Sequence, residues 1–290
     1  MQETGKNVAL VLGSGGARGI AHIAAIEELQ SRGYNITSVA GCSMGSVVGG
    51  IFAGGELNKF RDWLSELDYW DVFDLLDFSL SRKGLIKGEK VFKKIAPFIA
   101  DKSIENLSTP FVAVASDIIN KKPVVYSQGN LKDAIRASVS IPTVLTPIQT
   151  ETGVLVDGGI VNPLPVDLVK RNQGDLLVVV NLNAQIAPVS IQLKKKDQGI
   201  LDELSDRFFK WKNVEEKKRN DLGMFDMMNE SFDLLQETLT EYMVQTYKPD
   251  ISIDISRKQA DTMDFHRYAE IIEVGRRATA EALDRYESGK

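Results

Sequence analysis

The stretch VAGCSMGSVVGG, residues 39–50, gathers four glycines around two serines, a methionine and the only cysteine of the chain. Gly41, Ser43 and Gly45 fit the pattern G-x-S-x-G, between an apolar run and a run compatible with a helix. In this context the pattern predicts a sharp strand-to-helix turn with the serine at its apex. Both flanking positions must be glycine or very small, because a side chain there would collide with the neighbouring strand or helix. Ser43 is therefore a candidate nucleophile, and a purely structural turn is the alternative.

The same turn favours Ser43 over Cys42 as the nucleophile. It points the Ser43 hydroxyl at a helix N-terminus, where unpaired amides and the helix dipole stabilise developing negative charge. Cys42 precedes the apex, so we interpret it as a small buried residue and not as the nucleophile.

Short apolar runs alternate with helical patterns on either side of this stretch. They are typical of strands buried on both faces, with the intervening helices as covering layers, and they predict an α/β layered domain. The runs are residues 7–12, 38–42, 111–116, 153–158 and 176–182. Two helices are expected to pack on the sheet through Ile20, Ile23, Ile26 and Leu29, and through Leu131, Ala134, Ile135 and Ser138.

The chain divides into three parts. Residues 1–189 form the core, residues 190–248 are a charge-rich helical insertion, and residues 249–290 add a short strand and a closing helix from about residue 264. The insertion contains a narrow apolar seam at Phe225, Met228, Phe232, Leu235, Leu239 and Tyr242. We expect this seam to pack on its own domain, with a homodimer through residues 225–246 or a lid as alternatives. A cluster of aromatic and cationic residues in the insertion suits a lipid interface, and it comprises Arg207, Phe208, Phe209, Lys210, Trp211 and Lys212. Its acidic neighbours favour an exposed or partner-facing helix instead.

Composition restricts the class of function. The net charge of −5 over 290 residues gives no basic footprint for nucleic acid. One cysteine and two histidines are too few soft ligands for zinc or iron, and no cofactor is expected. No window approaches the roughly 18 apolar residues of a membrane-spanning helix, so any membrane contact would be peripheral. Cysteine usage and the lack of a secretory signal fit a cytoplasmic protein, and a leader removed beforehand is the alternative.

A second glycine-rich site lies between a predicted strand and a helix. Its consecutive glycines leave backbone N–H groups uncovered near a helix start, which describes an oxyanion hole. A dinucleotide fingerprint would need glycine at the position of Arg18, and a phosphate-binding Walker loop would need Lys followed by Ser or Thr. The site comprises Gly13, Ser14, Gly15, Gly16, Ala17, Arg18 and Gly19.

A third site, Asp157 with Gly158 and Gly159, follows the apolar residues of a predicted strand. Strand ends are where ligands collect in open α/β sheets. A partly desolvated carboxylate beside a serine can accept the serine proton as a general base. An Asx-type turn is the alternative, and the presence of the other two sites favours catalysis.

Together these sites resemble the patatin-like phospholipase family. The family has a glycine-rich loop, a G-x-S-x-G elbow and a later D-G-[GA] turn, which here are GSGGARG (13–19), GCSMG (41–45) and DGG (157–159). The runs ASVSIPTVLTPI (137–148) and DGGIVNPLP (157–165) are also similar to family segments. The resemblance covers residues 7–182 well and extends to the helix beyond 264, and nothing in the family matches residues 190–248.

The resemblance implies a three-layer α/β/α sandwich of patatin type with a mostly parallel sheet and a helical C-terminal extension. It implies a Ser43–Asp157 dyad that needs no histidine and no metal. The amides of Gly15, Gly16 and Ala17 would form the oxyanion hole, with Arg18 supporting the loop. The implied reaction is hydrolysis of a fatty acyl ester of a phospholipid or lysophospholipid through an acyl-serine intermediate.

Two other functions remain open. In a Ser-Asp-His hydrolase, His266 would complete a triad in the chain order Ser43, Asp157, His266. We expect His266 on a solvated helix surface and His22 in a packing or loop-supporting role, which argues against this triad. The other alternative is a non-catalytic lipid-binding scaffold with the same fold.

Overall fold

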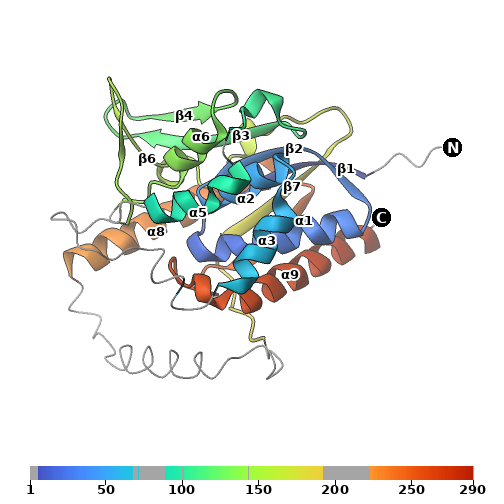
Figure 1. Ribbon diagram of the computed structural model, residues 1–290. Helices are drawn as coiled ribbons and strands as arrows, with labels where there is room; N and C mark the ends of the chain where they lie inside the picture. Colours follow the sequence, from blue (N-terminus) through green and yellow to red (C-terminus); the bar gives the residue numbers. More distant parts are fainter. Residues whose placement is uncertain are drawn as a thin grey trace.

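The computed structural model describes residues 6–67, 71, 89–99, 101–142, 144–191 and 223–289. Within them the chain forms an eight-stranded sheet with helices packed against it (Figure 1). The strands are β1 (Lys6–Leu12), β2 (Tyr34–Cys42), β3 (Phe111–Asp117), β4 (Lys122–Tyr126), β5 (Ile148–Gln149), β6 (Val154–Asp157), β7 (Leu176–Ala184) and β8 (Ile251–Ser256). The longer helices are α1 (Ala21–Ser31), α2 (Met44–Ala53), α3 (Leu57–Glu66), α5 (Glu89–Ile99), α6 (Leu131–Ser138), α8 (Met224–Tyr247) and α9 (Tyr268–Ser288).

The sheet is parallel over five neighbouring strands, in the order β8-β7-β1-β2-β3. β4 and β6 pair antiparallel with β3, and β5 pairs antiparallel with β6. Every apolar run singled out in the sequence coincides with a strand. The predicted α/β fold with a mostly parallel sheet and a helical C-terminal extension is confirmed, whereas β4 and β5 were not predicted.

Strand pairing brings three connecting segments to one edge of the sheet. β1 and β2 end side by side, with Leu12 paired to Gly41. β3 pairs with β2 on one side and, through Ala115, with Asp157 of β6 on the other. The segments that follow β1, β2 and β6 therefore meet where open α/β sheets bind their ligands.

The hydrophobic core is thick on one face of the sheet and thin on the other. The thick side includes buried residues of α1, α2, α3, α5, α6 and α9, and Figure 1 shows α1, α3 and α9 side by side there. The predicted packing residues of α1 and α6 are fully buried on this side. On the thin side, Val11, Leu177 and Val179 pack against residues that include Met243 and Val244 of α8.

Helix α8 packs through a different face from the predicted apolar seam. Met228, Leu235 and Tyr242 of that seam are 49%, 40% and 62% exposed. Phe232 and Leu239 are half-buried, and the Phe225 side chain lies outside the described residues. The prediction that the seam packs on its own domain is therefore wrong for most of its described residues.

The face that α8 turns to the domain is one residue further along the chain. Gln236 and Thr240 are 4% and 2% exposed, and Met243 and Val244 continue the same stripe at helical spacing. The middle of α8 packs through polar residues because the part of the domain that it contacts presents polar atoms that need hydrogen-bond partners. The seam as a dimer contact stays a prediction.

Part of the predicted insertion lies outside the described residues. This applies to residues 192–222, including the aromatic and cationic cluster at 207–212. Among the helices that are described, none has the length and apolarity required to cross a bilayer.

Candidate active site

Ser43 lies at the apex of a tight turn between β2 and α2. Its φ of 54° and ψ of −124° are rare for a residue with a side chain, a conformation that costs on the order of 1–3 kcal/mol. The surrounding contacts hold it there. The Ser43 amide donates to Ser138 Oγ at 3.0 Å, and Ser46 Oγ donates to the Ser43 carbonyl at 2.7 Å. The structure thus confirms the predicted sharp strand-to-helix turn with Ser43 at its apex.

The two glycines of the elbow are required by close backbone contacts. A Cβ at Gly41 would lie 2.4 Å from the Gly45 carbonyl oxygen, and a Cβ at Gly45 would lie 2.1 Å from the Leu12 carbonyl oxygen. Both obstacles are main-chain atoms within the core, which cannot rotate away. The glycines thus let α2 approach β1 closely enough for the turn to close.

We expect Gly45→Ala to destabilise the protein by about 3 kcal/mol or more, because overlap with backbone strains the core. Thermal unfolding followed by circular dichroism measures the loss. Gly33→Ala is the matched control, since its Cβ would meet nothing within 4 Å and only the φ of +77° opposes it, at about 1–2 kcal/mol. Equal losses in the two variants would show that the elbow relaxes freely and would contradict this explanation.

Asp157, at the end of β6, is fully buried and fixed by its neighbours. Its amide donates to the Ser140 carbonyl at 2.9 Å, and its carbonyl accepts from Ser116 Oγ at 2.8 Å. The Gly159 amide donates to Oδ1 at 2.7 Å. Within the described part of the chain, Oδ2 has no hydrogen-bond partner. One carboxylate oxygen is thus anchored, and the other is free to accept a proton.

Burial raises the pKa of Asp157 to about 7, because the charged form is desolvated. The Ser43 hydroxyl and the Gly159 amide act in the opposite direction and lower this pKa. Ser43 is therefore close to the carboxyl group, although the structure shows no hydrogen bond of ordinary length to Oδ2. Such contacts are often long before substrate binds. A carboxyl with a pKa near neutrality is suited to general-base chemistry.

The glycine-rich loop after β1 leaves two backbone N–H groups without an acceptor in the part of the chain that the structure describes, between two that are already engaged. The Ser14 amide donates to the Pro163 carbonyl, and the Ala17 amide donates to the Thr262 carbonyl at 2.9 Å. Between them, the amides of Gly15 and Gly16 have no hydrogen-bond acceptor among the described residues. The prediction that Ala17 supplies a third donor needs correction, because its N–H is already engaged.

Two buried side chains brace this loop. Arg18 donates from Nε to the Leu182 carbonyl at 3.1 Å and from Nη1 to the Ala260 carbonyl at 2.7 Å. His22 donates from Nε2 to the Gly13 carbonyl at 2.8 Å, and burial lowers its pKa to about 4. His22 is therefore neutral at physiological pH and supports the loop, as predicted.

The structure offers no sign of a histidine acting on Asp157. Burial, Ser43 and Gly159 account for the shifted pKa of the carboxyl, and neither His22 nor His266 contributes to it. His266 lies half-buried in the 3-10 turn Phe265–Arg267, before α9 and not on its solvated face as predicted. Cys42 is buried, and burial raises the pKa of its thiol, which agrees with a packing role.

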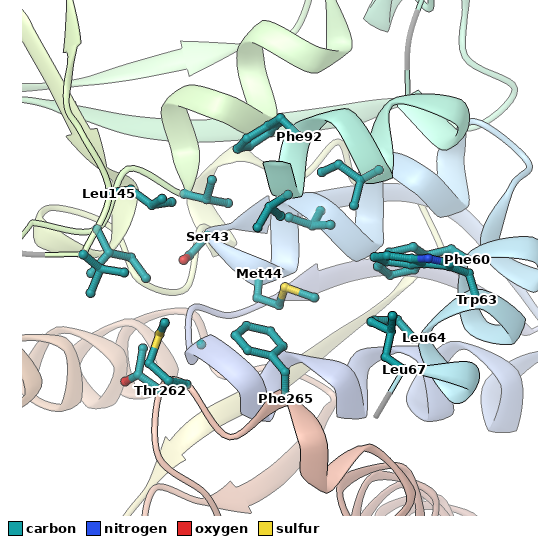
Figure 2. Close-up of a pocket in the computed structure, with 18 residues that line it drawn as sticks. Ser43, Met44, Phe60, Trp63, Leu64, Leu67, Phe92, Leu145, Thr262 and Phe265 are labelled. Atoms are coloured by element: carbon teal, nitrogen blue, oxygen red, sulfur yellow. The ribbon is translucent and has the colours of Figure 1, made fainter. Parts of the chain in front are cut away.

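An apolar pocket begins at Ser43. Figure 2 shows it extending from the serine past Met44 to Phe60 and Trp63 of α3, with Phe92 of α5 on one side and Phe265 on the other. Among its described lining residues, only the hydroxyls of Ser43 and Thr262 and the indole N–H of Trp63 are polar side-chain groups. The surface next to the serine is thus shaped for a hydrocarbon group.

Sequence reasoning missed several residues at this site. Thr262 and Phe265 come from the segment between β8 and α9, and Ser138 comes from the end of α6. Thr262 and Phe265 belong to no recognisable motif. Ser138 lies in the run 137–148 but was expected only to pack its helix on the sheet, because its contact with the Ser43 amide depends on the tertiary fold.

Comparison with known proteins agrees with this arrangement. The sequence profile described as Patatin-like phospholipase matches residues 10–170. The chain belongs to this family. Family membership supports a lipid hydrolase function in general terms.

Relatives match over different extents of the chain. An NTE family protein of Mycobacterium tuberculosis is 32% identical over 97% of this chain and 92% of its own length. Neuropathy target esterase sws of Drosophila melanogaster is 30% identical over 63% of this patatin-like chain and 13% of its own length. VipD from Legionella pneumophila matches in structure with a TM-score of 0.49 and 15% identity, over 97% of this chain and 67% of VipD.

Proposed function

We propose that the protein hydrolyses fatty acyl esters of phospholipids or lysophospholipids through an acyl-serine intermediate, with a Ser43–Asp157 dyad. The observation that carries the proposal is an apolar pocket that opens at a strained serine beside a buried carboxyl of raised pKa. A hydrocarbon chain bound in this pocket would place its ester carbonyl at the Ser43 hydroxyl. Membership of the patatin-like family supports the lipid class of substrate.

In the first half of the reaction, Ser43 Oγ attacks the acyl carbonyl carbon and Asp157 Oδ2 accepts the hydroxyl proton. The carbonyl oxygen becomes an oxyanion, which the amides of Gly15 and Gly16 stabilise. The intermediate collapses when the C–O bond to the alcohol breaks, and Asp157 returns the proton to the leaving oxygen. The products are an acyl-serine and the alcohol part of the lipid.

In the second half, water replaces the alcohol. Asp157 takes a proton from the water as it attacks the acyl-serine, and the same two amides hold the new oxyanion. Collapse releases the fatty acid and restores the Ser43 hydroxyl with the proton from Asp157. One carboxylate serves both halves, so this route uses no histidine.

An acyl-mimicking fluorophosphonate tests the nucleophile directly. We expect stoichiometric labelling of the wild type at Ser43, mapped by peptide mass spectrometry, together with turnover of p-nitrophenyl acyl esters. Long-chain esters should react faster than acetyl esters, because each buried CH₂ contributes about 0.8 kcal/mol to binding. Labelling at another residue, or no turnover of any ester or lipid, would contradict the proposal and favour a lipid-binding scaffold.

A further inference from the structure

The Ser14–Gly15 peptide has a support that no part of the proposed mechanism uses. The Ser14 carbonyl accepts a hydrogen bond from Asn183 Nδ2 at 3.2 Å. In a trans peptide, C=O and N–H point in opposite directions. The Asn183 contact therefore fixes where the Gly15 N–H points, namely away from Asn183.

Asn183 is itself held in one orientation. Its side chain lies near the end of β7 and is buried, and its backbone N–H donates to Asn181 Oδ1 at 2.9 Å. Nδ2 also lies 3.4 Å from Thr240 Oγ1 of α8. The two N–H groups of Nδ2 thus have acceptors in the Ser14 carbonyl and Thr240 Oγ1, which opposes a flip of this side chain.

A residue of α8 holds the Ser14 side chain, next to the same peptide unit. Gln236 is buried, and its Nε2 donates to Ser14 Oγ at 3.1 Å. The same nitrogen packs against Gly159, where a Cβ would approach it within 2.2 Å. Gly159 in turn donates its amide to Asp157 Oδ1. Gln236 therefore spans the gap between the glycine loop and the Asp157 turn.

We infer that Asn183 and Gln236 are positioning residues that orient the Gly15 N–H as an oxyanion donor. This inference rests on the proposed function, which assigns that role to the Gly15 amide. The four buried polar residues Ser14, Asn183, Gln236 and Thr240 link the loop after β1, the end of β7 and α8 at one place. Their contacts explain why the middle of α8 turns a polar face to the domain.

The kinetic test uses two substitutions of similar volume, Asn183→Leu and Gln236→Met. Loss of an oxyanion donor lowers turnover about 100-fold or more, so we expect this fall in kcat for Asn183→Leu. For Gln236→Met, which removes one neutral hydrogen bond, we expect a fall of about tenfold. KM for long-chain esters should change less than about threefold, because the apolar pocket is untouched. Gln245→Met is the matched control on the exposed side of α8 and should leave kcat unchanged.

A readout independent of activity separates this inference from the proposed function. Hydrogen–deuterium exchange should rise in peptides covering residues 12–19 of both variants and stay at wild-type rates in the Gln245→Met control. If the wild type hydrolyses no ester but exchange rises locally, positioning holds and the proposed function fails. If kcat stays within twofold of the wild type, or exchange and instability rise throughout the molecule, the positioning role is wrong.

Discussion

Ser43→Ala should abolish ester hydrolysis, with a fall in kcat of about 10⁴-fold or more, because it removes the hydroxyl on which the proposed acyl intermediate forms. Asp157→Asn should cause a loss of similar size. Its amide cannot accept the Ser43 proton, although its shape preserves the packing. Initial rates on p-nitrophenyl esters, measured with protein of verified folding, check both expectations.

The controls for this experiment are the two histidines. His266→Ala should retain hydrolysis, since nothing in the pKa of Asp157 indicates a contact with this ring. Loss of turnover in His266→Ala with retained folding would instead favour a Ser-Asp-His triad. His22 is unsuitable as a neutral control, because it braces the Gly13 carbonyl. The exposed residue Ser31 supplies a matched Ser→Ala control.

The second large effect concerns pH. Because Asp157 must be ionised to accept a proton and burial raises its pKa to about 7, kcat/KM should fall as the pH decreases through 7. A profile of kcat/KM between pH 5 and pH 9 measures this directly. A flat profile down to about pH 5 would show that another group is the base.

The same carboxyl makes stability depend on pH. The folded state retains the Asp157 proton up to about pH 7, whereas the unfolded chain releases it near the ordinary value of 3.8. Stability of the wild type therefore decreases as pH rises across this window. Asp157→Asn has no such proton to lose. Its stability relative to the wild type should improve by up to about 4 kcal/mol between pH 4 and pH 8.

Urea unfolding of both proteins at pH 4 and pH 8 measures this difference. An increased advantage of the variant at pH 8 would mean that the carboxylate is kept at the expense of stability. A constant difference between the two pH values would show that Asp157 ionises in the folded protein near its usual pH.

Much of the fold followed from local patterns in the sequence. Apolar runs identified the parallel strands because those strands are buried on both faces. β4 escaped prediction because its sequence, KPVVY, is short, contains a proline and lies at an exposed position beside β3. The seam of α8 was misassigned because the helix packs through Gln236 and Thr240, and periodicity of apolar residues carries no information on polar packing.

The residues of the candidate site likewise include some that the sequence predicts and some that it does not. Ser43, Asp157 and the glycine loop were recognisable because backbone conformation restricts which residues fit there. Asn183 and Gln236 were not, since an amide side chain in a strand or helix has no distinctive pattern. The engaged amide of Ala17 was equally hidden, because its acceptor, Thr262, is far away in the sequence.

The bracing of the glycine loop by Ala260 and Thr262 has a consequence for synthesis on the ribosome. The serine elbow and its glycines emerge early, but the carbonyl groups that receive the Arg18 side chain and the Ala17 amide emerge more than 200 residues later. A nascent or truncated chain that stops before Ala260 contains Ser43 and the glycine loop but lacks both carbonyl groups that hold this loop. The glycine loop can therefore take its final position only after residues 260–262 have been synthesised.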